Sequence, residues 1–368
     1  MPRKVKVGLI GCGNISNAYF TGCKRYDVLD LVACADLEFS RAQAKAEEYG
    51  VRALTVDELL ADPEIEIVIN LTIPQAHAPL NERILRAGKH AYVEKPFALN
   101  VAEAKRVLAL AKRKNLLVGG APDTFLGGGG QTARQLLEDG AIGRPVAATA
   151  YCMGRGHESW HPAPEFYYKQ GGGPMFDMGP YYITALVNLL GPVKRVSGST
   201  KASFPHRTIT SQPLAGKKVK VEVPTHYAGT MEFANGVIAT IIMSFDVWPG
   251  APMPFIELFG SEGTMFVPDP NTFTGPVQIK RAGEKEFAAA PLTHSEERLR
   301  GTGVADMAYS VLRRRRNFRC NGELTTHVVE VMSAFEQASK SGRYVSIKTK
   351  FTQPKGLPPQ LPDNVLDA

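Results

Sequence analysis

The feature that most constrains the fold is a glycine-rich turn placed directly after an apolar run. The run is Val5 to Ile10, and Gly11-Cys12-Gly13-Asn14-Ile15-Ser16 follows it without an intervening residue. In such a turn the first glycine makes the tight bend, the second lets backbone approach a pyrophosphate, and a small third residue permits close packing of helix on strand. A strand, this turn and a helix in succession predict a dinucleotide-binding βαβ unit.

Short apolar runs alternate with amphipathic stretches up to about residue 120, a pattern typical of βαβ units and a parallel sheet. Helices are expected between the strands, for example Arg41 to Tyr49 and Val101 to Lys114, the second preceded by Asn100 as an N-cap. The pattern therefore predicts a doubly wound Rossmann domain over residues 1–121. Its six expected strands are Val5 to Ile10, Leu29 to Ala35, one near Val51 to Leu54, Ile65 to Leu71, His90 to Val93, and Leu116 to Gly119.

Beyond this point the sequence pattern changes. A glycine cluster, Gly127 to Gly130, is followed by one helix-like stretch and then by mostly strand-like segments. The Asn235-Gly236 pair stands between two apolar runs and predicts a β-hairpin, because both residue types tolerate positive φ. Helical patterns return at Tyr181 to Leu190 and Val328 to Ser339. We therefore expect residues 122–368 to form an α+β domain with a large, mainly antiparallel open sheet.

The composition is that of an ordinary globular protein. The chain has 368 residues, of which 44% are hydrophobic and 21% charged, enough for two domains of usual size. The first apolar run is too short and too polar at its flanks for a signal peptide or a membrane span, so we expect a cytoplasmic protein without membrane contact. The formal net charge is +7, but Lys and Arg are spread along the chain, and nucleic acid is not expected as a partner.

Three other features suggest no chemistry of their own. The five cysteines and eight histidines show no C-x-x-C pair and no metal-ligand spacing, so neither disulfides nor a metal site is expected. The basic run Arg313 to Arg316 is interpreted as a solvated helix end, with a phosphate-bearing ligand or a partner subunit as the alternative. The proline-rich tail from Gln353 to Ala368 is expected to extend over the surface or across a subunit contact.

The glycine turn and the second strand carry the residues expected to bind a cofactor. Asp36 ends that strand about 20 residues beyond the glycines, as an acceptor for adenosine ribose hydroxyls, and its charge would repel a 2′-phosphate. NAD is therefore preferred over NADP, although Arg41 nearby could soften the discrimination. The alternative for Asp36 is a solvated carboxylate at a strand end. The turn residues expected to contact the cofactor are Gly11, Gly13, Asn14 and Ile15.

Two more motifs follow the fourth and fifth predicted strands, where an open α/β sheet places its ligands. They are Thr72-Ile73-Pro74-Gln75-Ala76-His77 and Glu94-Lys95-Pro96. With the glycine turn, Gly172 to Tyr181 and the later turn Gly260 to Thr264, their order resembles the Gfo/Idh/MocA family of oxidoreductases over nearly the whole chain. The resemblance implies a second domain that binds the substrate and forms a homodimer or homotetramer through its open sheet.

The resemblance also implies roles for the strand-end motifs. Lys95 would lie between the nicotinamide and the substrate and hydrogen-bond the reacting oxygen. Without the resemblance, Glu94-Lys95 is merely a charged pair at the end of a strand. The further residues implied at the cofactor are Thr72, Pro74, His77 and Glu94.

Many family members carry Asp-x-Gly-x-His where this chain has Asp177-Met178-Gly179-Pro180-Tyr181. Members similar to glucose-fructose oxidoreductase and dihydrodiol dehydrogenase also place Tyr there, which implies proton transfer by Tyr181, while Asp177 would orient Lys95 or bind a substrate hydroxyl. A phenol titrates at about pH 10 in water, and a cationic Lys95 nearby is expected to lower the pKa of Tyr181. The alternative for Tyr181 is aromatic packing at a helix start.

Two segments bear on the substrate. The loop from His157 to Pro162, with the aromatic run Phe166 to Tyr168 after it, suits the faces and hydroxyls of sugars. We expect His161 to contact the substrate; the alternatives are a loop pinned by its own aromatic residues and a subunit contact. The arginine that family members often carry after the sixth strand is replaced near Asp123, which bears on substrate identity.

The sequence thus predicts an oxidoreductase that transfers a hydride between NAD and a hydroxyl or keto carbon of a sugar, polyol or sugar derivative. Lys95, Asp177 and Tyr181 form its expected catalytic set, and the first and last of these would meet the same substrate oxygen. One alternative is a redox-assisted, NAD-dependent glycosidase of the same fold. Another is a regulator that senses the cofactor without turnover.

Overall fold

The computed structural model describes residues 3–248 and 253–367, and its first sheet is six-stranded and parallel. The strand order is β3-β2-β1-β4-β5-β6, so the winding direction reverses between β1 and β4, where ligands bind in sheets of this kind. The predicted doubly wound fold is confirmed. The strands are β1 (Val5–Ile10), β2 (Leu29–Ala35), β3 (Arg52–Leu54), β4 (Ile67–Asn70), β5 (His90–Val93) and β6 (Val118–Gly120).

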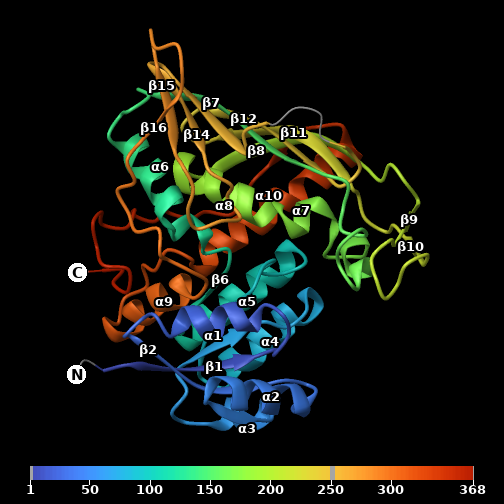
Figure 1. The fold of residues 1–368 in the computed structure, drawn as a ribbon, viewed down its shortest axis with the longest axis vertical. Helices are drawn as coiled ribbons and strands as arrows, with labels where there is room; N and C mark the ends of the chain where they lie inside the picture. Colours follow the sequence, from blue (N-terminus) through green and yellow to red (C-terminus); the bar gives the residue numbers. More distant parts are fainter. Residues whose placement is uncertain (1–2, 249–252, 368) are drawn as a thin grey trace.

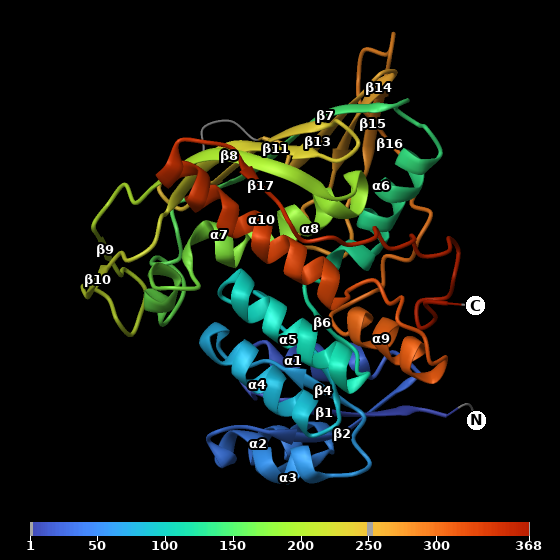
Figure 2. The same cartoon turned by 180° about the vertical axis from the view of Figure 1, so that it is seen from behind.

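Helices cover both faces of this sheet (Figures 1 and 2). The predicted cap of α5 is present, because the Asn100 side chain accepts a hydrogen bond of 3.0 Å from the Glu103 amide. All four residues of β4 are buried, as expected for a strand with helices on each side. The helices are α1 (Ser16–Cys23), α2 (Phe39–Tyr49), α3 (Val56–Ala61), α4 (Pro74–Arg86) and α5 (Val101–Lys114).

The second sheet has nine strands in the order β16-β15-β14-β13-β7-β12-β11-β8-β17. Its neighbours pair antiparallel except β7 and β12, which are parallel, so the predicted mainly antiparallel sheet is confirmed. The strands are β7 (Pro145–Met153), β8 (Val193–Lys201), β11 (His226–Phe233), β12 (Ile238–Ser244), β13 (Ile256–Gly260), β14 (Gly263–Val267), β15 (Gln278–Arg281), β16 (Ala288–Ala289) and β17 (Val345–Ser346).

Three helices lie between this sheet and the Rossmann domain (Figures 1 and 2). They are α6 (Gly128–Glu138), α8 (Gly179–Leu190) and α10 (Gly322–Ser341). Every residue of α8 is buried, which matches its almost wholly apolar sequence. The short strands β9 (His206–Thr208) and β10 (Lys218–Lys220) form a separate ribbon at one side of the molecule (Figure 1).

The predicted Asn235-Gly236 hairpin is confirmed, and the structure adds detail there and at the glycine cluster. The Asn235-Gly236 hairpin joins β11 to β12, but only Gly236 has positive φ, at 91°, while the Asn235 side chain accepts from the Val237 amide at 3.1 Å. The helix-like stretch expected after the glycine cluster begins inside the cluster, because α6 starts at Gly128. A Cβ atom on Gly128 would lie 2.6 Å from the carbonyl oxygen of Ser295, so close packing explains the glycine.

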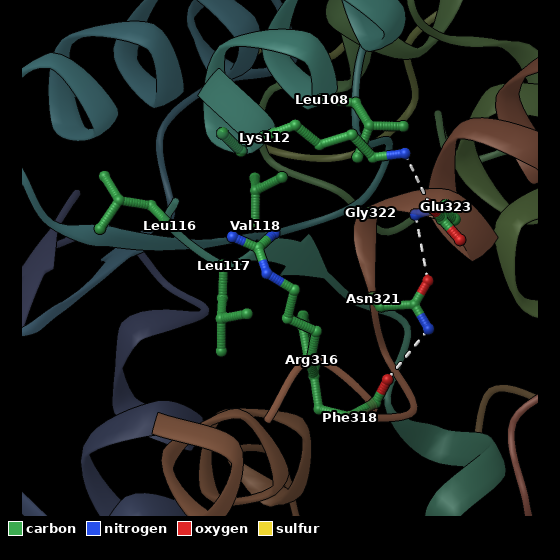
Figure 3. A pocket seen from close by; sticks show the side chains of 11 residues that line it. Leu108, Lys112, Leu116, Leu117, Val118, Arg316, Phe318, Asn321, Gly322 and Glu323 are labelled. Carbon is green, nitrogen blue, oxygen red and sulfur yellow. Dashed lines mark hydrogen bonds and ion pairs between the residues drawn. The ribbon is translucent and has the colours of Figure 1, made fainter. Parts of the chain in front are cut away.

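The end of the chain returns to the Rossmann domain. Helix α9 (Thr302–Leu312) packs on α1, and the Gly120 amide of β6 donates to the Cys320 carbonyl at 3.0 Å. A cleft of about 220 Å³ lies at this junction, where Lys112 of α5 pairs with Glu323 of α10 at 2.7 Å (Figure 3). The division of the chain at residue 121 stays a prediction, since segments from both halves share this contact.

The remaining predictions concern the surface and the thiols. The exposed run Arg313 to Arg316 follows directly on the end of α9 at Leu312, as expected for a solvated helix end, and Arg316 lines the cleft of Figure 3. The tail packs on its own chain, with Leu357 and Leu366 buried. All five cysteines are free thiols. Within residues 3–248 and 253–367, no helix is long and apolar enough to cross a membrane.

Candidate active site

The glycine turn between β1 and α1 is open to a ligand. Gly11 has φ of 104°, and a Cβ atom there would lie 2.7 Å from the Leu71 carbonyl, so only glycine fits. Gly13 has no atom within 4 Å of its ideal Cβ position. In the part of the chain that the structure describes, the amides of Gly13, Asn14 and Ile15 donate no hydrogen bond. These free amides at a helix start fit a pyrophosphate.

Asp36 lies beside this turn at the end of β2. Its Oδ2 accepts a hydrogen bond of 2.7 Å from the Cys12 amide, and its Oδ1 accepts one of 2.9 Å from the Glu38 amide. The carboxylate is therefore fixed at the turn and keeps acceptor capacity for ribose hydroxyls. Arg41 is directed at Glu38, with 2.8 Å between Nε and Oε2.

A pocket of about 290 Å³ continues from the turn into the space between the domains. It brings together seven residues that the sequence predicted at the site: Ile15, Thr72, Pro74, Glu94, Lys95, Asp177 and Tyr181. Thr72 follows β4, and its hydroxyl donates to the buried Asn70 at 2.6 Å. Phe166 and Tyr167 form an aromatic wall opposite the strand ends.

Lys95 is held by α7 (Gly173–Asp177). Its ammonium donates to the Asp177 carbonyl at 2.9 Å and to the Asp177 Oδ1 at 2.7 Å. Asp177 Oδ2 lies 2.9 Å from Nε2 of His157, so the carboxylate joins the two side chains. An ammonium has three protons to donate, and two of them are used here. The third is free to bind an oxygen in the pocket.

The charges in this group stabilise one another. Burial opposes the ammonium form of Lys95, but attraction to Asp177, Tyr181 and Glu94 outweighs burial and raises the pKa of Lys95. Burial likewise opposes the carboxylate of Asp177, yet Lys95 and His157 hold its pKa well below its usual range. Lys95 is therefore a charged hydrogen-bond donor over the physiological pH range, not a general base.

Tyr181 stands in the first turn of α8 with its phenol toward the same pocket. The Lys95 ammonium lies 5.2 Å from the centre of its ring. Arg300 donates a hydrogen bond of 2.8 Å to the phenolic oxygen. Lys95 acts to lower the pKa of Tyr181, as expected, but it does not set the net direction of the shift. Burial is the largest effect and raises this pKa, although Lys95 and Arg300 act in the opposite direction.

His77 does not offer its side chain to a cofactor. It is 1% exposed, its Nδ1 lies 2.7 Å from the Pro96 carbonyl, and its Nε2 lies 2.9 Å from the Thr72 carbonyl. The ring therefore joins the two segments that follow β4 and β5. The prediction placed it at the cofactor, whereas these contacts make it a support beneath the residues that line the pocket.

His161 is not among the residues that line the pocket. Its ring packs edge-on against Phe166 and Tyr167, and its Nδ1 accepts from the Ala163 amide at 3.0 Å. The structure thus favours the alternative of a loop pinned by its own aromatic residues. His157, four residues earlier, is the histidine that reaches Asp177.

Buried charges hold this loop in place. Arg207 of β9 is 4% exposed and binds Glu158 at 2.5 Å through Nε and Asp246 at 2.9 Å through Nη1. Tyr168 donates its hydroxyl to the same Glu158 carboxylate. The residue next to His157 is thereby fixed to the β9–β10 ribbon, and His157 faces Asp177 as a result.

Two residues that contact the predicted site residues were missed from the sequence. His157 was recognised only as part of an aromatic loop, and no spacing distinguishes it from His161. Arg300 lies in a segment without a motif, 119 residues from Tyr181 along the chain.

Comparison with known proteins is consistent with this geometry. Residues 5–120 match a family model described as an oxidoreductase family with an NAD-binding Rossmann fold, and residues 131–266 match the GFO/IDH/MocA C-terminal domain. A dTDP-3,4-didehydro-2,6-dideoxy-α-D-glucose 3-reductase of Streptomyces violaceoruber is 30% identical, over 63% of this chain and 67% of its own length. Two uncharacterised oxidoreductases of Schizosaccharomyces pombe are each 30% identical, and the chain spans about half of their length, 56% and 44%.

The fold is also that of solved structures. Levoglucosan dehydrogenase, in a complex with NADH and levoglucosan, superimposes with a TM-score of 0.80 at 19% identity, over 95% of this chain and all of that one. An aldose-aldose oxidoreductase from Caulobacter crescentus, in a complex with glycerol, gives 0.78 at 20% identity, over 94% of this chain and all of that one. At these identities the likeness shows the fold alone.

Proposed function

Since the chain belongs to the Gfo/Idh/MocA family of oxidoreductases, with an NAD-binding Rossmann domain, we propose that it transfers a hydride between NAD and a hydroxyl or keto carbon of a sugar, polyol or sugar derivative. The observation that carries the proposal is the charged Lys95 beside Tyr181 in one pocket that continues into the glycine turn. The sugar reductase of Streptomyces violaceoruber supports the substrate class. NAD, when bound, supplies the hydride acceptor or donor.

The residues of the pocket have separate roles in binding the substrate and moving its proton. Lys95 donates its third proton to the reacting oxygen and stabilises negative charge that develops there. Asp177 keeps Lys95 charged and directed, through contacts of 2.9 and 2.7 Å. Tyr181 gives the oxygen its proton in reduction and removes it in oxidation. Phe166 and Tyr167 cover the apolar face of a sugar ring.

NAD is preferred over NADP in this proposal. A 2′-phosphate would approach the carboxylate of Asp36, which is held beside the glycine turn. Arg41 is paired with Glu38 and thus partly neutralised. Arg41, the cation that could have attracted the 2′-phosphate of NADP, is therefore directed at the carboxylate of Glu38.

The test is a substrate screen on the purified protein. Thermal stabilisation by NAD and by NADP is compared first, and then aldoses, polyols, inositols and glycosides are supplied while the absorbance of NADH is followed. We expect greater stabilisation by NAD and net NADH formation with at least one polyhydroxylated substrate. Aglycone release without net NADH would instead identify a redox-assisted glycosidase, and no turnover with any substrate would contradict both.

The raised pKa of Tyr181 predicts how the rate depends on pH. Because the phenol is protonated near neutrality, the form that accepts a proton is scarce, and its fraction rises about tenfold per pH unit below the pKa. The initial rate of alcohol oxidation should therefore increase through the alkaline range, whereas reduction should not. The same increase in Tyr181→Phe would show that another group titrates.

We also propose a homodimer or homotetramer. Among residues 3–248 and 253–367, no helix covers the face of the nine-stranded sheet that is turned away from the Rossmann domain (Figures 1 and 2). On this face Ile238 of β12 is half exposed, at 51%, and Ile242 on the same side of the strand is partly buried. An apolar sheet surface of this kind favours self-association. Sedimentation of the purified protein measures the assembly size.

A further inference from the structure

Arg300 is a cation inside the site that neither the motifs nor the proposed roles use. It lies just before α9, and its side chain is 14% exposed. Its Nη2 donates to the Tyr181 oxygen at 2.8 Å. Its Nη1 faces Glu94 and Asp123 at 3.7 Å each, and in the described part of the chain this nitrogen has no hydrogen-bond partner.

Two contacts, one with Asp123 and one with α1 of the Rossmann domain, fix the backbone that carries this guanidinium. Asp123 Oδ2 accepts hydrogen bonds from the Gly301 and Gly303 amides, at 3.1 and 3.0 Å. On α1, a Cβ atom at Gly22 would lie 1.6 Å from the Arg300 carbonyl oxygen, so the segment is seated directly on that glycine. The position of Arg300 is therefore fixed by contacts of its own backbone segment.

The contact determines which way the phenol can donate. A guanidinium only donates hydrogen bonds, whereas a phenolic oxygen both donates and accepts. Tyr181 therefore accepts from Arg300, and its own proton points to a different partner. Because the phenol lines the pocket, this proton is available to a substrate oxygen bound there. Resting on the proposed function, we propose that Arg300 positions Tyr181 for proton transfer and stabilises the phenolate that the transfer leaves.

The proton balance of this step is simple. In reduction the O–H bond of Tyr181 breaks as an O–H bond forms on the substrate oxygen, whose carbon takes the hydride. The phenolate keeps the electron pair, lies between Arg300 and Lys95, and recovers a proton from water. In oxidation the same step runs in reverse. Arg300 acts through Tyr181, so it is a positioning residue.

The groups around the phenol give the expected sign of the effect. Burial raises the pKa of Tyr181, and Glu94 acts in the same direction, while Lys95 and Arg300 lower it. The remaining ionisable groups nearby are Asp177 and Tyr167 in the pocket, and Tyr19 of α1 and Asp123 behind the guanidinium. Removing Arg300 deletes one of two cations that favour the phenolate, so the pKa of Tyr181 should rise further.

The experiment measures the ionisation of Tyr181 directly by NMR of protein labelled with ¹³C at the tyrosine ring carbon that bears oxygen. The chain has twelve tyrosines, and the resonance missing in Tyr181→Phe identifies the one of interest. In Arg300→Met we expect its midpoint about one to two pH units higher than in the parent, as for loss of a charge-assisted hydrogen bond. Arg300→Lys should give a smaller rise, because it keeps the charge without the planar fork.

The control is Arg25→Gln, which removes an exposed arginine that binds Glu297 of the same segment but lies outside the phenol network. It should leave the midpoint unchanged. If Arg300→Met does not fold, Arg300→Lys carries the test, with folding checked by circular dichroism. An unchanged Tyr181 midpoint in a folded Arg300 variant overturns the proposal. The titration needs no substrate, so this outcome is separate from a failed search for dehydrogenase activity.

Discussion

Replacing Lys95 by alanine is expected to lower kcat by about 10²- to 10³-fold, the usual effect of removing one donor that stabilises an oxyanion. The ammonium uses two protons on Asp177, at 2.9 and 2.7 Å, and directs the third into the pocket. Without it the reacting oxygen loses its cation, and Asp177 keeps only His157 as a partner. Steady-state rates on the substrate found in the screen measure the loss.

NAD binding should survive the same substitution, because the glycine turn and Asp36 do not depend on Lys95. Thermal stabilisation by NAD is the readout for this half of the prediction. Lys112→Ala is the matched control, since Lys112 is exposed and paired with Glu323 in the cleft of Figure 3, away from the site. A near-normal kcat in Lys95→Ala would show that another group polarises the substrate.

The second large effect is expected at Gly13. A Cβ atom there meets no protein atom within 4 Å, so we expect the free Gly13→Val protein to melt close to the parent's temperature. The added side chain would occupy the space through which a pyrophosphate approaches the free amides. NAD at a hundredfold excess over its Kd stabilises the parent by about 2.7 kcal/mol, and this gain should disappear in Gly13→Val.

Gly154→Val is the appropriate comparison for this variant. Gly154 also has open space around its ideal Cβ position, but it lies beyond the end of β7 in the second domain. Its NAD-induced stabilisation should equal the parent's. If Gly13→Val kept the full stabilisation, the cofactor would have to bind without approaching this turn.

The architecture was predictable because its signals are local. Buried parallel strands such as β4 read as short apolar runs, and the side chain of Asn100 marks the start of α5 within one turn. The strand-end residues were found for the same reason. Lys95 lies two residues after the end of β5, Asp177 and Tyr181 lie in consecutive helices, and the sheet and α8 bring them into one pocket.

The parts that escaped prediction depend on contacts between distant segments. Whether His157 or His161 faces Asp177 is decided by the ion pair of Glu158 with Arg207, which are 49 residues apart. The inward position of His77 depends on the carbonyl of Pro96, 19 residues later. The pKa of Tyr181 depends on how deeply the folded chain buries it, and the neighbouring charge alone gives the wrong sign.

The attachment of α9 to the Rossmann domain has a consequence for how the substrate enters and leaves. Tyr26 binds Thr302 at 2.6 Å and Gly22 of α1 lies against the Arg300 carbonyl, so Arg300 moves with the first domain while Tyr181 belongs to the second. A hinge motion between the domains would break the Arg300–Tyr181 hydrogen bond in every turnover. The wall of Phe166 and Tyr167 belongs instead to a loop that packs on a small separate core, formed by Tyr168, Ile209, Val219 and Phe245. We therefore expect that loop to open and close over the substrate, while the Arg300–Tyr181 pair stays assembled.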